Sequence, residues 1–133
     1  MTSTLPLTLL GSIKSAFGTS LILAPNWTAN MVYYRTLTPG PSDLAIRMIG
    51  TRELLFGALL LSAESLETRR AVVMASAAVD ILDLVATLWG WEMGQVEGVT
   101  AGVFTFAAGA SVLLAGLAWT EAGLGRALGT RKM

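Results

Sequence analysis

The sequence predicts an all-α integral membrane protein, a four-helix bundle built as a single domain over residues 1–133. Hydrophobic residues make up 53% of the chain and charged residues only 14%, whereas an ordinary soluble domain is roughly 25% charged. The mean hydropathy is +0.63. Four windows are each long enough, at about 20 mostly apolar residues, to cross about 30 Å of hydrocarbon. These observations indicate that lipid, rather than water, surrounds most of the chain.

The four expected spans cover residues 5–23, 44–62, 71–91 and 99–119. Proline, glycine and charged residues separate them, in residues 24–43, Glu64–Arg70 and Glu92–Gly98. Met1–Leu5 carries no basic residue and Lys14 interrupts the first window, so we expect a retained span rather than a cleaved signal peptide. A soluble helical bundle is disfavoured because the last span is apolar on all sides and offers water no polar stripe.

The Lys and Arg residues outside the spans predict the orientation of the chain, because cytoplasmic loops carry an excess of both. Five lie on the side shared by the loop after the second span and the C-terminal tail: Arg69, Arg70, Arg126, Arg131 and Lys132. Arg35 alone lies on the other side. Both termini are therefore expected in the cytoplasm. The protein would be multi-pass, in the endoplasmic reticulum membrane if the cell is eukaryotic.

The composition also excludes several kinds of chemistry. The chain has no cysteine and no histidine, so it has no disulfide, no thiolate nucleophile, no Ser-His triad and none of the usual zinc or haem ligands. Nine basic residues balance nine acidic ones, which leaves no surplus of positive charge for binding nucleic acid. We expect no metal and no cofactor, and any chemistry depends on carboxylates, amines, guanidines and hydroxyls.

Six charged residues fall inside the expected spans: Lys14, Arg47, Arg52, Glu53, Asp80 and Asp83. Each would cost about 2.5–3.5 kcal/mol at the centre of a lipid-facing helix, so they are expected to face the interior of the bundle. All but Arg47 lie about eight to twelve residues from the start of their spans, which corresponds to similar depths near the midplane. A single cluster of charges is the simplest arrangement.

The third span carries its polar residues on one face, with Ser76, Asp80, Asp83 and Thr87 at positions i, i+4, i+7 and i+11. Two carboxylates on one face cannot both be ionised cheaply in a low dielectric, so one is expected to hold a proton unless Lys14 or Arg52 pairs with each. A protonated acid beside an ionised one is what acid/base catalysis requires.

The second span places Glu53 on the same side as Gly50 and Gly57, where the missing side chains allow a neighbouring helix to approach. Arg52 lies about 100° further round the helix, so it can meet a different neighbour.

These positions give a candidate site. Asp80 and Asp83 are the expected acid and base, in an order that the sequence leaves open, and Glu53 is a second carboxylate. Arg52 and Lys14 would orient these acids or stabilise a developing oxyanion. Further residues are candidates for binding a substrate: Arg47, Ser76, Thr87, Tyr33, Tyr34 and Trp27. The aromatic ones are expected to anchor a short interfacial helix, in residues 24–43, that covers the cavity.

The segment Gly50-Thr51-Arg52-Glu53-Leu54-Leu55-Phe56-Gly57 resembles the Gly-x-Arg-Asp/Glu-Leu-x-x-Gly motif of a family of small membrane proteins. That family is known as domain of unknown function 4267. Further features are similar to the pattern of that family: the ending of the first span, Arg69-Arg70 before the third span, and the acidic residue Asp80 or Asp83. The resemblance implies a four-span fold and, for some fungal members, a place among genes that make terpenoid or polyketide metabolites.

Two functions from different classes are therefore expected. One is a membrane-embedded isomerase or cyclase, with epoxide opening as a variant, that acts on a lipophilic terpenoid or polyketide-type molecule entering from the bilayer. The other is a non-catalytic membrane protein, a lipophile-binding protein, assembly partner or small carrier, in which the charges form a structural network. The fourth span also carries a stripe of small residues at Gly98, Gly102, Gly109 and Gly116. This stripe is expected to pack within the bundle or, as the alternative, against a second copy.

Overall fold

The computed structural model describes residues 5–31 and 42–121, and these residues form five α-helices and no strand. The helices are α1 (Leu5–Leu23), α2 (Pro25–Met31), α3 (Ser42–Ser62), α4 (Leu66–Glu92) and α5 (Gly98–Glu121). By length and composition, α1, α4 and α5 can each cross a membrane. The expected all-helical class is confirmed, with three candidate membrane helices. At 21 residues α3 is as long as a span, but its charged residues Arg47, Arg52 and Glu53 lie close together within it.

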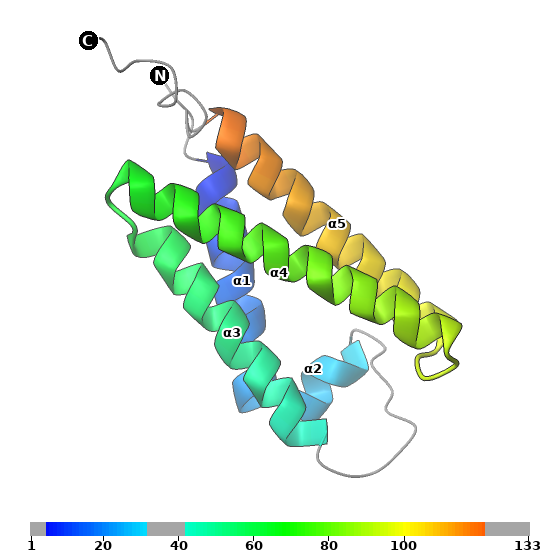
Figure 1. Ribbon diagram of the computed structural model, residues 1–133. Helices are drawn as coiled ribbons and strands as arrows, with labels where there is room; N and C mark the ends of the chain where they lie inside the picture. The colour runs from blue at the N-terminus through cyan, green and yellow to red at the C-terminus, as the bar shows by residue number, and fades with distance from the viewer. Residues whose placement is uncertain (1–4, 32–41, 122–133) are drawn as a thin grey trace, which may run out of the picture.

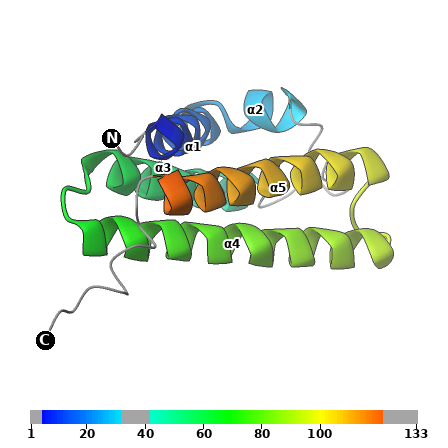
Figure 2. The same ribbon diagram turned by 90° about the horizontal axis from the view of Figure 1, so that it is seen from above.

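The four long helices run up and down the molecule in alternation. Figure 1 shows α1 descending, α3 returning, α4 descending again and α5 ending beside the start of α1. The most extensive contacts are those of α1 with α3 and of α4 with α5. Figure 2 shows α4 and α5 side by side, with α1 on the opposite side of the bundle. Because α3 and α4 meet near their connection and then diverge, they contact each other much less.

Glycine allows α1 and α3 to pack almost backbone against backbone. A Cβ atom added at Gly18 would lie 2.6 Å from the carbonyl oxygen of Gly50 and 2.8 Å from the Cα of Leu54. At Gly57 it would lie 2.7 Å from the carbonyl oxygen of Gly11. These distances are too short for any side chain, so the glycines set the separation of the two helices, as expected for Gly50 and Gly57.

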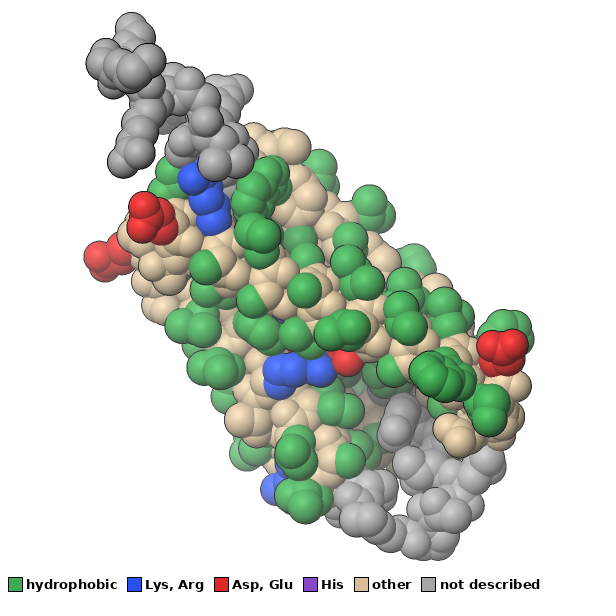
Figure 3. Space-filling model, viewed as in Figure 1, with side chains coloured by type: hydrophobic (Ala, Val, Ile, Leu, Met, Phe, Trp, Pro, Cys, Tyr) green, Lys and Arg blue, Asp and Glu red, His purple; other side chains and the backbone are tan. Residues whose placement is uncertain are grey.

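The core of the bundle lies near the end where α3 connects to α4. Leu10, Leu60, Val73 and Ala118, one from each long helix, are buried together there. Between the two ends the surface is mostly apolar, and the charged side chains on the face in Figure 3 gather mainly at the ends. Phe106 and Leu113 of α5, for example, are 79% and 71% exposed. A surface of this kind suits contact with lipid and supports a membrane protein.

Short connections and capping bonds join the helices. Ser65 caps α4 by accepting a hydrogen bond from the backbone N–H of Thr68 at 3.1 Å. α4 therefore begins at Leu66, earlier than the expected residue 71, because Glu67, Arg69 and Arg70 form a polar first turn of the helix rather than a loop. α2 confirms a short helix after the first span, and the hydroxyl of Thr28 ties it to α1 by donating to the carbonyl oxygen of Ser20 at 2.9 Å.

The glycine stripe of α5 is not packed within the described part of the chain. A Cβ atom added at Gly102, Gly109 or Gly116 would meet nothing within 4 Å, and one at Gly98 would meet only the indole nitrogen of Trp91, at 3.6 Å. The expectation that this stripe packs inside the bundle is therefore wrong. Self-association through it stays a prediction.

Candidate functional site

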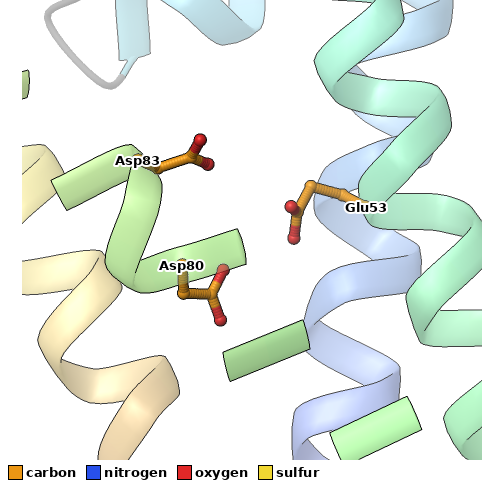
Figure 4. Close-up of side chains that lie close together, drawn as sticks. All are labelled: Glu53, Asp80 and Asp83. Carbon is orange, nitrogen blue, oxygen red and sulfur yellow. The ribbon is translucent and has the colours of Figure 1, made fainter. Parts of the chain in front are cut away.

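Charged side chains from three helices meet at one level in the middle of the bundle. Lys14 comes from α1, Arg52 and Glu53 come from α3, and Asp80 and Asp83 come from α4. Figure 4 shows the three carboxylates directed toward the same space between α3 and α4. The convergence expected from their positions along the spans is confirmed.

Lys14 is the buried centre of this cluster, with only 5% of its side chain exposed. Its ammonium nitrogen lies 2.8 Å from Oε2 of Glu53 and 2.9 Å from Oδ1 of Asp80, donating a hydrogen bond to each. A buried ammonium is tolerated only when it is paired and hydrogen-bonded. Lys14 thus joins α1 to both α3 and α4.

Arg52 makes the second set of ion pairs. Its Nη1 donates to Oδ1 of Asp83 at 3.1 Å, and its Nη2 donates to Oδ2 of the same carboxylate at 2.5 Å. Its Nε and Nη2 also donate to Oε1 of Glu53, at 3.3 and 3.2 Å. Although Arg52 and Glu53 are neighbours on a helix and start in different directions, the long arginine side chain reaches back to the cluster. The two residues therefore serve one site.

The pairs form a chain of alternating charge, Asp80–Lys14–Glu53–Arg52–Asp83. Glu53 contacts two cations, whereas each aspartate at the ends of the chain contacts one. The two ends also lie near each other, since one oxygen from each of the three carboxylates falls within 4.8 Å of the others. Among these described residues, two cations face three carboxylates.

Ser111 of α5 completes the cluster, and the sequence analysis did not identify it. Its hydroxyl donates a hydrogen bond to Oδ2 of Asp80 at 2.5 Å. Asp80 therefore has one charged donor, Lys14, and one neutral donor. The signal available in the sequence was a hydroxyl near the middle of an otherwise apolar span, but which helix it would face could not be read from spacing alone.

A cavity of about 310 Å³ adjoins the cluster. All five charged residues and Ser111 line it, and most of the remaining lining is apolar. The apolar part comes mainly from α1 and α5: Leu10, Ile13, Phe17, Val103, Phe104, Ala107, Ala108, Ala110 and Leu114. Its volume is at the lower end of the range for small-molecule pockets, about 300–1,000 Å³. Apolar walls with a few convergent polar groups are typical of such pockets.

One side of the cluster reaches the surface of the protein. The side chains of Asp83 and Arg52 are 41% and 31% exposed, whereas those of Glu53 and Asp80 are 9% exposed. Figure 3 shows a basic and an acidic side chain touching at the surface where α3 and α4 diverge. The site is therefore buried at Lys14 and accessible at Arg52 and Asp83.

The structure does not place all the candidate binding residues at the cavity. Thr87 lines it and donates to the backbone carbonyl oxygen of Asp83 at 2.7 Å. Arg47 is exposed on α3, Trp27 is 63% exposed on α2, and neither lines the cavity. Ser76 is 1% exposed and lies on the same face as Asp80, but outside the cavity lining.

The expected cover over the cavity is likewise not formed by the described part of the 24–43 segment. No residue of α2, Pro25–Met31, is among the lining residues. α2 packs on α1 and α3 instead. Tyr33 and Tyr34 lie outside the described residues.

The three carboxylates are close enough together to hold a metal ion. Their oxygens, however, already accept hydrogen bonds from Lys14, Arg52 and Ser111. A metal ion would have to compete with these donors for the same oxygens. The geometry therefore fits a network of proton donors and acceptors better than a metal centre.

No protein-family model, curated protein or solved structure matches this chain. The function is accordingly argued from the chemistry of the site itself.

Proposed function

We propose that this protein is a membrane-embedded acid/base enzyme, an isomerase or cyclase that acts on a lipophilic small molecule. The observation that carries the proposal is that a chain of acids and bases lines an apolar cavity. In a membrane protein, ionisable groups in the interior are expensive and usually serve a function. The resemblance to the family of domain of unknown function 4267 adds terpenoid or polyketide-type molecules as the substrate class.

Asp80 and Asp83 are the proposed proton donor and acceptor. Two cations face three carboxylates, so one carboxylate can hold a proton, and we assign it to Asp80 because the single cation that Asp80 contacts is shared with Glu53. Asp83 fits the acceptor because Arg52 holds both of its oxygens by hydrogen bonds and its side chain, at the cavity, is 41% exposed. Glu53, held by two cations, has the role of an anchor.

An isomerisation then needs only two proton transfers. Asp80 gives its proton to the substrate, where a C–H bond forms as the O–H bond breaks, and Asp83 removes a proton from a neighbouring carbon. The substrate keeps its composition, and the proton passes back from Asp83 to Asp80 before the next turnover. For an epoxide, the same proton would go to the ring oxygen as a C–O bond breaks, and Asp83 would remove a proton from the neighbouring carbon, so that an allylic alcohol forms.

The substrate would enter from the bilayer. In the proposed topology α3 is a fourth span, and both termini face the cytoplasm, in the endoplasmic reticulum membrane if the cell is eukaryotic. One end of the bundle holds the starts of α1 and α4 and the ends of α3 and α5. This arrangement supports an even number of membrane crossings. The half-exposed pair of Arg52 and Asp83 marks the side by which the cavity would be reached.

Uptake of deuterium from the solvent tests this proposal directly. The protein in nanodiscs is incubated in heavy water with the lipophilic extract of its native membranes, and mass spectrometry follows deuterium in individual compounds. We expect uptake with the wild type and with Arg47→Gln, an exposed arginine outside the cavity. Asp80→Asn and Asp83→Asn should each abolish it. Equal uptake by correctly folded Asp80→Asn protein would refute the proposal.

A non-catalytic membrane protein is the second candidate, and one observation favours it. Every carboxylate oxygen of the cluster accepts a hydrogen bond from Lys14, Arg52 or Ser111, as in a structural network. This alternative covers lipophile binding, assembly and transport. It predicts that Asp80→Asn changes stability or partner binding. It also predicts that no compound takes up deuterium, even with the wild type.

A further inference from the structure

We infer that the cavity is built to receive positive charge, so that its ligands are lipophilic monocations and its substrates are molecules that become cationic when protonated. Olefins, epoxides and imines belong to this class. Ketones that react through an enolate do not. The inference rests on the proposed function, since it names the substrate class of that site.

The first argument is the balance of charge around the cavity. Among the described lining residues, Lys14 and Arg52 supply two positive charges and the three carboxylates supply three negative ones. Once Asp80 has given up the proton of the proposed mechanism, all five are ionised and the wall carries one negative charge in excess. In a medium of low dielectric an unbalanced charge is costly, so a single positive charge, brought by a ligand or developed on a substrate, is favoured there.

The second argument is the direction of the hydrogen-bond donors. All four side-chain nitrogens of Lys14 and Arg52 donate to carboxylates. Two of the three N–H groups of Lys14 and four of the five of Arg52 are used in this way, which leaves one on each residue. Few donors are therefore left for an oxyanion hole, and the role of these two residues as oxyanion stabilisers stays a prediction. Most of their N–H groups hold the carboxylates in place.

The third argument is the apolar part of the cavity lining. Phe17 of α1 and Phe104 of α5 both line the cavity. Aromatic rings attract organic cations, and more strongly where water is excluded. A cavity lined by carboxylates together with aromatic and aliphatic groups is suited to a cation that also carries hydrocarbon.

An excess of one negative charge also favours a ligand with a single positive charge over a divalent ion. A divalent metal ion would leave the wall with an excess of positive charge, and it would compete with the ammonium of Lys14 for Glu53 and Asp80. An organic monocation neutralises the wall and fills the apolar volume as well.

A series of matched probes tests the inference. 1-Adamantylammonium, 1-adamantanol and 1-adamantanecarboxylate share one compact hydrocarbon cage and differ in charge. Their binding to the full chain in zwitterionic nanodiscs is measured by calorimetry, with empty nanodiscs as the blank. We expect the ammonium to bind at least about tenfold more tightly than the alcohol, and the carboxylate to bind most weakly.

Two variants separate charge from volume. Asp80→Asn removes the excess charge and keeps an oxygen for the hydroxyl of Ser111, so the ammonium and the alcohol should then bind about equally well. Ala108→Phe fills the cavity from α5 and should weaken all three probes. Leu113→Phe, at a position on the same helix that is 71% exposed and outside the cavity lining, is the matched control and should bind like the wild type.

Each outcome decides a different claim. If the alcohol or the carboxylate binds wild-type protein as tightly as the ammonium, the preference for positive charge is refuted, whereas the cavity remains a site for lipophilic molecules and the proposed function stands. A tenfold preference that persists in Asp80→Asn also refutes the inference. If none of the three probes binds the wild type, both this inference and the proposed function lose their basis.

Discussion

Lys14 Nζ lies 2.9 Å from Oδ1 of Asp80, although the two residues are 66 positions apart in the chain. The same nitrogen lies 2.8 Å from Oε2 of Glu53. One ammonium on α1 therefore compensates carboxylates on two other helices. Changes to this network, or to the helix packing that positions it, should therefore alter the stability of the fold.

Replacing Lys14 by Met should destabilise the fold strongly. Glu53 and Asp80 would keep their burial and lose the cation they share, and removing one partner of a buried pair typically costs about 3–5 kcal/mol. The free energy of unfolding in detergent, followed by circular dichroism, measures the effect. Arg47→Met removes an exposed cation of α3 and should change stability little. If Lys14→Met is as stable as the wild type, the ion pairs of Lys14 contribute little to the free energy of unfolding.

The double variant Lys14→Met, Asp80→Asn should recover part of that loss. Glu53 still contacts Arg52 in Lys14→Met, whereas Asp80 loses its cation. Asp80→Asn removes the charge that is left uncompensated, so the two substitutions should not be additive. Coupling energies of about 0.5–3 kcal/mol are usual for residues in contact. A double-mutant cycle of unfolding free energies gives the value, and simple additivity would contradict the direct ion pair.

Ser111→Ala should lower stability by about 1–3 kcal/mol, because a buried oxygen of Asp80 loses its only neutral donor. Ser111→Thr keeps the hydroxyl and serves as the matched control. The proposed role of Asp80 as proton donor adds a second readout, the rate of deuterium uptake, which should fall in Ser111→Ala and be largely retained in Ser111→Thr. Retention of both stability and rate in Ser111→Ala would leave the hydroxyl without a role.

Gly18→Ala and Gly102→Ala should have opposite effects on stability. At Gly18 the added methyl group would meet the backbone of α3 at 2.6 Å from the Gly50 oxygen, and backbone atoms cannot move aside cheaply. At Gly102 nothing lies within 4 Å, and alanine favours a helix over glycine by roughly 0.8–1 kcal/mol. Thermal unfolding of both variants makes the comparison. Equal tolerance at the two sites would contradict the close packing of α1 on α3.

Ser65→Ala should cost about 1 kcal/mol, because the first turn of α4 loses the side chain that accepts from the Thr68 N–H. Ser65→Asp keeps an acceptor and should preserve stability. Amide hydrogen exchange over residues 66–69 reports the fraying directly. Unchanged exchange in Ser65→Ala would indicate that the cap contributes nothing.

The sequence was sufficient for the helices because length and apolar composition determine where a chain can cross a bilayer. The expected first span coincides with α1, residues 5–23. The start of α4 was missed because Glu67, Arg69 and Arg70 are polar, and polarity locates the edge of the hydrocarbon rather than the end of the helix. The charges inside the spans could also be placed at one depth, because a helix rises by a fixed distance per residue.

The partners within the site could not be predicted, because they depend on which helices are neighbours. Spacing showed that Asp80 and Asp83 share a face, but not that Lys14 would join Asp80 to Glu53. The small residues of α5 were misread for the same reason. Glycine spacing shows that a close approach is possible, and in the described residues the close approach occurs instead between Gly18 of α1 and Gly50 of α3.

The pairing of Lys14 with Asp80 has a consequence for biosynthesis. At about 5–20 residues per second, the ribosome adds Asp80 roughly 3–13 s after Lys14. Glu53 is added 39 residues after Lys14 and Asp80 only 66 residues after it, so the ion pairs of α1 stay incomplete during that interval, and an incompletely paired charge in hydrocarbon is expensive. The nascent first helix must therefore wait at the translocon, at the membrane surface or beside a chaperone until α4 has been made. Only then can the helices settle together into the bilayer.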